Sequence, residues 1–553
     1  MSFCTSCGSS VSANAKFCSS CGKPAITAQT SNAQSSSSVN TVSASGGYGS
    51  SVSGDVASAI SQTIFVVPVS FLNSLDKIFQ EKGISSFAAV GAIGTAEDIR
   101  QKVLGKISAS PQKSMRYVCL IGDWNDVPPF EFYPEQQIDR DKFFSTDSFY
   151  GCTGDYEESP IEAAIPDLLV GRIPSLSANV VSEALFAKLG VDEDAKTAFS
   201  FAVSCEKWTI PTQTIVNEFL GTPHFERSKQ SPESGSIDDC SVLLCPQWLE
   251  PDLRGAVDKK ITKPNSVILF NVHGGPDEPG WVGQSKHDKY DQPKIFGPNT
   301  VNDFNSAVVV TEACYGGALS YSSISIAESF FENKGRSFVG SSTIAYGTPS
   351  DENIFAADIM ALNYLLHLSR GFSSGDSLNY AKERVLSSDP LCSPVTVKTI
   401  LSFNLFGAPW YSRRKSSSNA RVARASTTDG RSIVDEIRNR SNSLNIDKDD
   451  VLVNIRNRYR SSLSDKGKQF FYKADQAREK LKRFIDYEKV NDLLEDWCED
   501  PDVFTLQFLS NGNEEGYVLY SEGKSRGIST EMMILNLDAN GSLKQTLTSK
   551  GML

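Results

Sequence analysis

Histidine is scarce in this chain, and so are the signals that would place a protein in a membrane or on nucleic acid. Among 553 residues there are four histidines, His224, His273, His287 and His367. No apolar run approaches the roughly 20 residues that a membrane-spanning helix needs, and no charged-then-apolar segment typical of a secretory signal opens the sequence. The formal net charge of −12 argues against bulk nucleic-acid binding, which requires a basic surface. We therefore expect a cytoplasmic protein that binds neither membranes nor nucleic acid.

The sequence also lacks the paired cysteines of a disulfide framework. It has twelve cysteines, and outside an amino-terminal motif they are scattered as single residues. Scattered thiols in a long chain indicate reduced cysteines. A composition of 40% hydrophobic and 22% charged residues is typical of a globular protein, and the length allows a large core.

Four of the cysteines form a compact motif at the start of the chain. Residues 4–22 read CTSCGSSVSANAKFCSSCG, with two Cys-x-x-Cys-Gly knuckles. Four thiolates in two such pairs suit a tetrahedral zinc ion. Redox-active Cys-x-x-Cys pairs are the alternative, but no thioredoxin-like βαβ pattern surrounds them. The segment resembles the short zinc-ribbon modules at the amino termini of many prokaryotic proteins, which implies a structural zinc site and docking to a protein partner. The expected zinc ligands are Cys4, Cys7, Cys18 and Cys21.

A segment without any charged residue follows, from Pro24 to Gly54, and it is dominated by Ser, Ala, Gly, Asn and Thr. Such a segment has too little apolar surface to offset the entropy of ordering, which is typical of a flexible tether. We therefore expect a zinc ribbon at residues 1–24 and a flexible linker at residues 25–60.

The middle of the chain alternates apolar runs with helical patterns. Strands are predicted at residues 64–67, 87–90, 117–121, 168–170, 199–203 and 337–340. Helices are predicted near residues 72–82, 95–108, 178–190, 352–368 and 376–386. This alternation predicts an α/β fold, a parallel sheet with helices on both faces.

Two further apolar runs each end in a reactive side chain followed by glycines. Residues 266–275 read SVILFNVHGG, and residues 306–319 read SAVVVTEACYGGAL. Such runs indicate strands buried on both faces, so His273 and Cys314 would lie at strand carboxyl ends, where open α/β sheets bind ligands. The pattern predicts a cysteine nucleophile with a histidine partner, and the glycines offer backbone amides for an oxyanion. The spacing alone leaves open that Cys314 is a small buried hydrophobic residue and His273 a loop residue.

These motifs resemble the caspase-like cysteine peptidases and, within them, the gingipain family. Four further segments agree with that family in the same order: LIGDWNDVP at 120–128, STDSFY at 145–150, PDLLVGRIP at 166–174 and NLFGAP at 404–409. The resemblance spans roughly residues 64 to 411. It implies a caspase-like sheet sandwich and cysteine endopeptidase activity, although Ala408 stands where the family usually has Asp.

The resemblance also implies roles for individual residues. The Cys314 thiolate would attack the scissile carbonyl, His273 would protonate the leaving amine, and the amides of Gly274 and Cys314 would form the oxyanion hole. A carboxylate that orients the histidine is expected as well. The sequence leaves its identity open among Glu135, Asp139 and Asp141.

Substrate preference is expected to depend on Asp147. In arginine-cutting members of the family, the matching acid lies in the pocket for the residue before the scissile bond, so the resemblance implies cleavage after Arg or Lys. A charge pair in contact is worth about 4 kcal/mol at an effective dielectric near 20. The alternative is an Asp that only caps a turn in Ser-Thr-Asp-Ser. Trp281 lies in the loop-like insert between His273 and Cys314, and we expect this insert to wall the substrate cleft.

The chain changes character after Tyr411. Residues 412–431 are small, polar and basic, which predicts an exposed linker, and an enzyme specific for basic residues is expected to cut itself there. Residues 432–553 lie outside the resemblance and are expected to form an α+β module. Helices are predicted at residues 433–442, 450–462 and 466–495, strands at 504–508, 517–520 and 532–537, and a hairpin turn at 538–541.

The sequence therefore predicts a peptidase domain at residues 61–411 between the tether and the basic linker. One rival interpretation is a zinc-ribbon adaptor that uses a degenerate peptidase fold for binding. The other is a caspase-like peptidase that prefers acidic or small residues. Calcium is compatible with such folds, but no motif specifies its ligands, and none specifies the physiological substrate, the activating signal or the oligomeric state.

Overall fold

The computed structural model describes residues 54–412, apart from short gaps, together with the strand segments 2–3, 10–11, 469–473, 503–510, 515–525, 528–538 and 543–549. The gaps lie at residues 110–114, 135–137, 158–159, 187–198, 221–241, 250–252, 255–265, 277–278, 289, 301, 320–322, 350–352 and 390–391. The chain divides into two compact units, Met1–Ser50 and Ser51–Leu553. In the first unit, β1 (Ser2–Phe3) pairs with β2 (Ser10–Val11), and the four expected zinc ligands lie outside the described residues.

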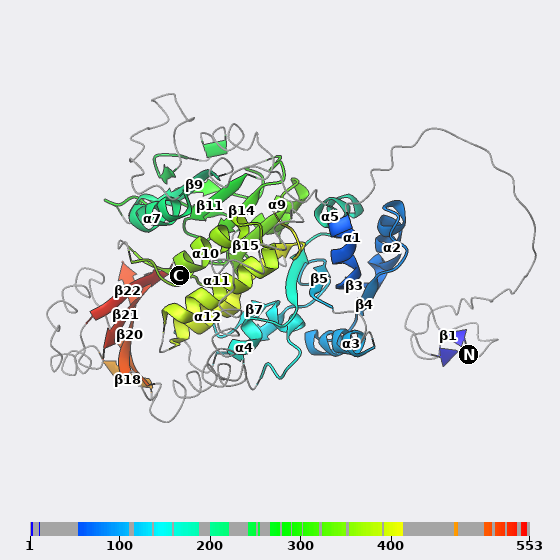
Figure 1. The fold of residues 1–553 in the computed structure, drawn as a ribbon. Coiled ribbons are helices and arrows are strands. Elements are labelled where there is room, and N and C mark those ends of the chain that lie inside the picture. Colours follow the sequence, from blue (N-terminus) through cyan, green and yellow to red (C-terminus); the bar gives the residue numbers. More distant parts are fainter. Residues whose placement is uncertain are drawn as a thin grey trace, which may run out of the picture. The chain divides into compact units, whose positions relative to one another are not determined.

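The second unit contains a ten-stranded sheet (Figure 1), formed largely by the apolar runs of the sequence. Its order is β10-β9-β11-β14-β15-β17-β8-β5-β3-β4. The strands are β3 (Thr63–Pro68), β4 (Ala88–Ala92), β5 (Tyr117–Ile121), β8 (Leu169–Ile173), β9 (Phe199–Cys205), β10 (Val242–Cys245), β11 (Val267–Asn271), β14 (Val308–Thr311), β15 (Ser337–Ser341) and β17 (Phe403–Gly407). Every residue of β11, β14 and β15 is buried, and because successive residues point to opposite faces, both faces of the sheet are covered there.

The sheet consists of two parallel halves that meet at one antiparallel junction. β10, β9, β11, β14 and β15 are parallel to one another, and β17, β8, β5, β3 and β4 form the other parallel set. β15 and β17 are antiparallel, which differs from the all-parallel expectation. The difference arises because the helices between these two strands return the chain in the opposite direction. The carboxyl ends of the two sets of strands therefore point to opposite edges of the sheet.

Helices connect the strands on both sides of the junction. They are α1 (Gly54–Ser61), α2 (Leu72–Glu81), α3 (Ala96–Ser108), α4 (Pro160–Ala164), α5 (Ala178–Leu185), α7 (Thr209–Leu220), α9 (Ile326–Glu332), α10 (Ala357–Ser369), α11 (Ser374–Ser388) and α12 (Pro394–Ser402). Capping boxes formed by Thr95 with Asp98 and by Ser325 with Glu328 begin α3 and α9. The helix predicted from residue 352 begins only at Ala357, because Ala356 has a left-handed backbone (φ 48°) that a helix cannot continue through.

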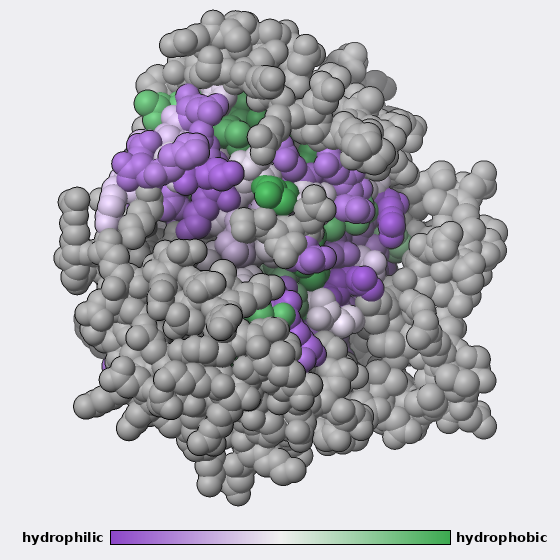
Figure 2. Space-filling model, turned by 90° about the vertical axis from the view of Figure 1, so that its left-hand side faces the viewer, coloured by the Kyte–Doolittle hydropathy of each residue, from purple (hydrophilic) through white to green (hydrophobic). Residues whose placement is uncertain are grey.

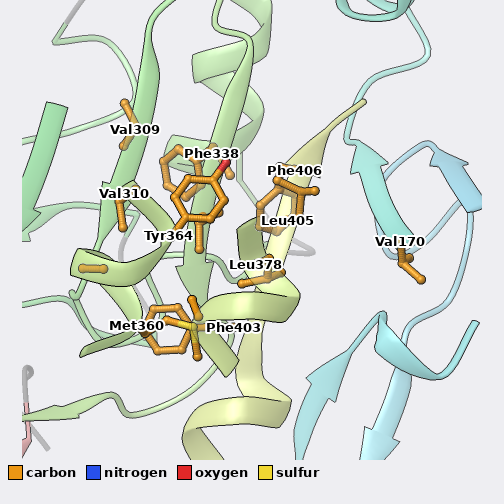
Figure 3. Close-up of a cluster of buried hydrophobic side chains, with 14 of the residues drawn as sticks. Val170, Val309, Val310, Phe338, Met360, Tyr364, Leu378, Phe403, Leu405 and Phe406 are labelled. Carbon is orange, nitrogen blue, oxygen red and sulfur yellow. The ribbon is translucent and has the colours of Figure 1, made fainter. Parts of the chain in front are cut away.

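The core of the second unit lies between the middle of the sheet and α10 and α11. Figure 3 shows Phe338, Tyr364 and Leu405 gathered there, with Met360 and Leu378 from the two helices beside them. All are buried, and the Tyr364 hydroxyl is hydrogen-bonded to the Ser337 hydroxyl at 2.7 Å. This packing fixes β14 and β15. The segments that follow their carboxyl ends contain Cys314 and Ala345.

A second sheet of six strands follows in the order β16-β22-β21-β20-β19-β18. It combines β16 (Tyr346–Gly347) with β18 (Gln469–Lys473), β19 (Val503–Ser510), β20 (Glu515–Ser525), β21 (Ile528–Asp538) and β22 (Leu543–Ser549). The three predicted strands and the hairpin between β21 and β22 are confirmed. The prediction of helix is wrong at residues 469–473, because QFFYK pairs with β19 as a strand and its three aromatic residues favour that conformation. The rest of the predicted carboxy-terminal helices lies outside the described residues.

The described surface is mostly hydrophilic on the face that Figure 2 shows, and its apolar residues form small separate patches. Within the described part of the chain, no helix has both the length and the apolar character needed to cross a membrane.

Candidate active site

The register of β11 and β14 brings the two predicted reactive residues to neighbouring strand ends. Phe270 is the partner of Thr311, and the Glu312 N–H donates to the Phe270 carbonyl at 2.8 Å. His273 and Cys314 each follow three residues after this pair. The parallel register therefore carries both residues to the same edge of the sheet, side by side along the strand direction.

The Cys314 thiol is buried against the backbone of Ala345. Cys314 is 1% exposed. Its Sγ donates to the Ala345 carbonyl at 3.5 Å and accepts the Ala345 N–H at 3.3 Å. Burial raises the pKa of Cys314 far above its ordinary value, and the Ala345 N–H and the charge of Lys398 only partly oppose this shift. Burial therefore favours the protonated thiol in this conformation.

The His273 imidazole is fully buried and held on two sides. Its Nε2 is 2.8 Å from Oε1 of Gln284, which is itself 2% exposed. The ring packs on Trp208 with a centroid distance of 4.4 Å. Its backbone pairs with Val282, since the His273 N–H donates to the Val282 carbonyl at 3.1 Å and the Val282 N–H donates back at 3.0 Å. These contacts fix both the position of the residue and the plane of its ring.

The backbone around the two residues is tightly packed. A Cβ atom at Gly274 would lie 2.1 Å from the Cys314 carbonyl oxygen, so only glycine allows the two strand ends to approach this closely. Tyr315, directly after the thiol, has a left-handed backbone with φ 54°, which is costly for a non-glycine residue and is found where structure imposes a sharp turn. The Gly316 and Gly317 amides donate to Ala313 and Ser341 carbonyls, so both are used within the fold.

A cleft of about 630 Å³ opens beside Cys314. Gly275 and Trp281 contribute from the insert, and Tyr315 and Gly316 from the turn after the thiol. The hairpin of β6 (Phe130–Phe132) and β7 (Phe144–Thr146) also contributes to the lining. The charged residues of the lining are Glu131, Arg140, Asp141 and Lys142. The cleft has the size of a small-ligand or side-chain site, and one reactive group lines it.

Asp147 does not lie in this cleft lining, and its carboxylate is already occupied. Arg172 binds it at both oxygens, with Nη2 to Oδ1 at 2.7 Å and Nε to Oδ2 at 2.8 Å. The Arg172 Nη1 also donates to the carbonyls of Gly122, Asp123 and Val127. Asp147 is 3% exposed and Arg172 is fully buried. We therefore correct the sequence-based assignment: Asp147 is a partner of a buried arginine within the fold and is not positioned to bind a substrate side chain.

The two described candidates for the histidine-orienting carboxylate contact other groups. Asp139 accepts from Lys398 Nζ at 2.5 Å and from the Tyr346 hydroxyl at 2.6 Å. Asp141 accepts from the Tyr315 hydroxyl at 2.6 Å, from Lys398 at 3.3 Å and from the Thr343 hydroxyl. Burial acts to raise the pKa of Asp141, but the Lys398 charge and these hydrogen bonds lower it below its usual value. The third candidate, Glu135, lies outside the described residues.

The other predicted residues have ordinary surroundings. Trp281 belongs to β12 (Trp281–Val282), which pairs with β13 (Lys294–Phe296), so the predicted loop contains a hairpin. The Trp281 ring lines the cleft but is 2% exposed, because it stacks on Phe296 at 5.4 Å. His287 is exposed. His367 of α10 is buried between the rings of Phe372, in the connection to α11, and Tyr380 of α11. His224 lies outside the described residues.

The described side chains form no cluster suited to a metal ion. No group of three or more His, Cys, Asp or Glu residues arranged to hold a metal ion occurs in that part of the chain. The four cysteines expected to bind zinc belong to residues that the structure does not describe.

Two contacts near the candidate site were not predicted from the sequence. Gln284 reaches His273 from the loop after β12, and Lys398 on α12 forms ion pairs with Asp139 and Asp141, which lie more than 250 residues away in the chain. The first had only a weak signal, an amide three residues after a tryptophan in a polar insert. The second had none, because one lysine on an amphipathic helix is normally an exposed residue.

Two family models match the sequence. A zinc-ribbon domain matches residues 3–25. Peptidase family C25 matches residues 72–199 and 210–412, which is more than half of the chain. No curated protein sequence matches.

Two solved structures resemble the chain at low identity. The crystal structure of the Arg-specific cysteine proteinase gingipain R has 13% identity and a TM-score of 0.44, and the similarity covers 64% of this chain and 79% of that one. A structure titled only as a protease has 10% identity and a TM-score of 0.42, and it covers 89% of this chain and 91% of its own.

Proposed function

We propose, for a chain that belongs to the cysteine peptidase family C25, that Cys314 is the nucleophile and His273 the proton-transfer partner of an endopeptidase. The observation that carries the proposal is the register of β11 and β14, which brings a thiol and an imidazole to adjacent strand ends. The cleft beside Cys314 supports it, because a scissile bond needs access to the sulfur from one side.

The proposed reaction has two halves. The Cys314 thiol gives its proton to His273 and the sulfur attacks the scissile carbonyl carbon. The resulting oxyanion is met by the N–H groups of Gly274 and Cys314, a role that the close approach of their backbones supports. His273 then protonates the leaving amine, the C–N bond breaks, and water hydrolyses the thioester to regenerate the thiol.

The test compares two buried cysteines. Cys314→Ala should abolish peptide hydrolysis, while Cys119→Ala, which removes a buried thiol in β5, should leave unchanged both hydrolysis and the alkylation of Cys314 by iodoacetamide, as followed by mass spectrometry of the peptide that contains it. Circular dichroism and the thermal unfolding midpoint report whether each variant is folded. Full activity of a folded Cys314→Ala variant would refute the assignment.

Preference for Arg or Lys before the scissile bond remains part of the proposal, but a residue other than Asp147 must recognise the basic side chain. The acids of the cleft are Glu131 and Asp141, and the second is already bound by Lys398. We therefore assign recognition of a basic side chain to Glu131. For an exposed charge pair the expected loss of Arg-over-Glu preference in Glu131→Gln is about 2- to 5-fold in kcat/KM. Asp155→Asn, at an exposed acid outside the cleft lining, is the matched control.

Self-processing in residues 412–431 follows if the enzyme cuts after basic residues. That linker contains Arg413, Arg414, Lys415, Arg421, Arg424 and Arg431. Purified wild-type protein should lose its full-length band during incubation, and Cys314→Ala protein should keep it. Equal persistence of both bands ends this part of the proposal.

The zinc ribbon and the cellular location complete the proposal. Cys4, Cys7, Cys18 and Cys21 would hold one structural zinc ion, which closes a module that docks a protein partner. A reducing, cytoplasmic location is supported by the free state of all six cysteines in the described part of the chain, including Cys205 and Cys245, which lie opposite each other on β9 and β10. Zinc content of wild-type protein against a Cys18→Ser variant, measured by mass spectrometry, tests the metal site.

A further inference from the structure

The hydrogen bond between His273 and Gln284 places a neutral amide where a carboxylate was expected. Gln284 Oε1 lies 2.8 Å from Nε2 of His273, and both side chains are buried. Because an amide oxygen is only an acceptor, this contact requires the proton on Nε2, which leaves Nδ1 with the lone pair of the neutral imidazole. The described candidates, Asp139 and Asp141, are bound to Lys398.

We infer that Gln284 is the positioning residue of the active site, which selects the Nε2–H tautomer of His273 and aims Nδ1 at the thiol and the leaving amine. The inference rests on the proposed Cys314–His273 function. Two hydrogen bonds to Glu206 fix the position of Gln284. The backbone carbonyl of Gln284 accepts the Glu206 N–H at 3.0 Å, and the hydroxyl of the next residue, Ser285, donates to the Glu206 carboxylate. A neutral amide orients the imidazole without stabilising its protonated form, unlike a carboxylate.

Glu206 is a charged residue that contacts this loop. Its carboxylate accepts from the Ser285 hydroxyl at 3.3 Å, the Lys286 N–H at 3.2 Å and the Gln247 amide at 2.8 Å. Gln247 is exposed, so it offers a matched control: Gln247→Ala removes an amide from the same cluster and leaves the bond to His273 intact.

The experiment compares Gln284→Ala, Gln284→Glu and Gln247→Ala in the full chain. Gln284→Ala should lower kcat about 10- to 100-fold with little change in KM. Gln284→Glu should keep most of the activity and move the pH–rate profile to higher pH, because a carboxylate favours the protonated imidazole. Gln247→Ala should match wild type. Wild-type kcat and an unmoved pH profile in both Gln284 variants would overturn the inference.

A readout without peptide hydrolysis separates this inference from the proposed function. The pH dependence of Cys314 alkylation by iodoacetamide reports the imidazole beside the thiol, and it should shift in Gln284→Glu alone. If wild-type protein cleaves no peptide, the proposed function fails while the alkylation profile still decides the role of Gln284.

A second, independent observation concerns β16, the strand that follows Ala345. Ala345 contacts Cys314 Sγ through both its N–H and its carbonyl, and β16 begins at the next residue. β16 pairs antiparallel with β22 near the end of the chain, where Tyr346 is opposite Ser549 and Gly347 is opposite Thr548. The carboxy-terminal strand therefore occupies a backbone edge one residue away from the contact with the nucleophile.

The contact is a packed one. Thr548 and Ser549 are 1% and 0% exposed, and Leu547 belongs to the same hydrophobic cluster as the peptidase core. An extended peptide binds to a protein most simply by adding to a free strand edge. An endopeptidase substrate must lie extended past the nucleophile, so β22 occupies an edge of the kind that such a substrate would need.

We propose that β22 is an intramolecular inhibitor, which covers the edge of β16 and keeps Ala345 on the Cys314 thiol until the carboxy-terminal strand leaves. The burial of Cys314, which favours the protonated thiol, agrees with such a latent conformation. Cleavage in the linker at 412–431 would release the inhibitor by making a strand that is tethered at high effective concentration into a separate chain that can dissociate.

The test uses full-length variants in which proline interrupts β22 beside β16. Thr548→Pro and Ser549→Pro remove the N–H groups at the two paired positions, one of which must face β16. Gln545→Ala, which alters β22 opposite Asn536 of β21, is the control. At least one proline variant should be alkylated at Cys314 about 10-fold faster or more, by the loss of a covering contact, and a peptide of residues 543–553 added in trans should reverse the gain.

The outcomes are distinct. Wild-type alkylation rates in both folded proline variants, or no effect of the added peptide on the faster one, would overturn the inhibitor assignment. Should both variants unfold, the alkylation rate of Cys314 in protein that lacks residues 543–553 is compared with the rate in the full chain. Fast alkylation without peptide hydrolysis would leave β22 as a cover of the thiol and refute the peptidase proposal instead.

Discussion

Arg172 and Lys398 are both cations buried against aspartates, but the two clusters differ in how completely their charges are paired. Arg172 meets the single carboxylate of Asp147 through two hydrogen bonds and gives its remaining donors to backbone carbonyls. Lys398 meets two carboxylates, Asp139 and Asp141, with one ammonium group. The first cluster is neutral and sealed. The second carries an excess negative charge, and Asp141 is 14% exposed toward the cleft.

The comparison separates a fold element from an element of the site. A buried pair with all its hydrogen bonds made fixes the backbone around it, because breaking it leaves an uncompensated charge in the interior. A cluster with more acids than bases beside a cleft instead sets the electrostatic surroundings of its neighbours. For Cys314, Lys398 lowers and the two aspartates raise the thiol pKa. Three predictions probe this difference.

Replacing Arg172 should have the largest effect on stability. Arg172→Leu leaves the Asp147 carboxylate and three carbonyls without their donor, so the free energy of unfolding should fall by about 3–5 kcal/mol. Arg116→Leu is the matched control, since Arg116 pairs with Asp376 at the surface and its side chain is 52% exposed. That change should cost below about 1 kcal/mol. Urea unfolding in the Cys314→Ala background measures both, and equal losses would erase the distinction between sealed and surface pairs.

Replacing Lys398 should cost less and should depend on pH. Lys398→Met should lower the free energy of unfolding by about 2–3 kcal/mol at pH 7, because one of the two aspartates can take up a proton and restore part of the balance. That proton is bound by the folded state at a pH where the unfolded aspartate has lost it, so the deficit should shrink as the pH falls from 7 toward 5.

The Lys398 variant should also react more slowly with iodoacetamide at Cys314, because a charge that favours the thiolate is gone. Lys334→Met is the control, since Lys334 pairs with Asp303 on the surface and should change neither measurement noticeably. A pH-independent deficit with an unchanged alkylation rate would contradict the role given to this cluster.

The central sheet could be predicted from the sequence because its strands are continuous apolar runs. Val267–Asn271 and Val308–Thr311 are buried on both faces, so they carry no alternation and read as strands without tertiary information. The strand at Gln469–Lys473 was predicted as part of a helix, because Phe470 and Phe471 also fit helical spacing with residues farther along. Only pairing with β19 decides between the two, and pairing is not local.

The sequence predicts the part of the candidate site that lies directly after the two apolar strands. His273 and Cys314 follow apolar runs, and the family motifs fixed their order, although their catalytic roles stay a prediction. Asp147 was assigned wrongly because its short segment resembles a specificity motif, whereas the deciding contact comes from Arg172 on another strand. Gln284 was not predicted, because the resemblance implies a carboxylate as the partner of His273. Side chains that come into contact only through the tertiary structure have no characteristic spacing in the sequence, so such contacts cannot be predicted from it.

Lys382 extends the comparison to a buried cation bound only by neutral groups, and it should give the smallest effect. Its ammonium donates to the Ser148 hydroxyl at 2.8 Å and the Ala164 carbonyl at 3.0 Å. Burial lowers the pKa of Lys382 to about 7, against the opposing influence of the Asp147 charge. An unfolded lysine titrates near about 10.4. Between these values the unfolded chain holds a proton that the folded protein lacks, so this residue makes stability rise with pH.

Lys382→Met should remove that rise. Between pH 7.5 and 9.5, the free energy of unfolding of the parent protein should increase by about 2 kcal/mol relative to the variant, from a slope of at most about 1.4 kcal/mol per pH unit. Lys77→Met, at an exposed position of α2, should give a difference from the parent that stays constant with pH. Parallel curves for parent and Lys382→Met would mean that the buried ammonium stays charged, and that Asp147 neutralises two cations where Asp139 and Asp141 share one.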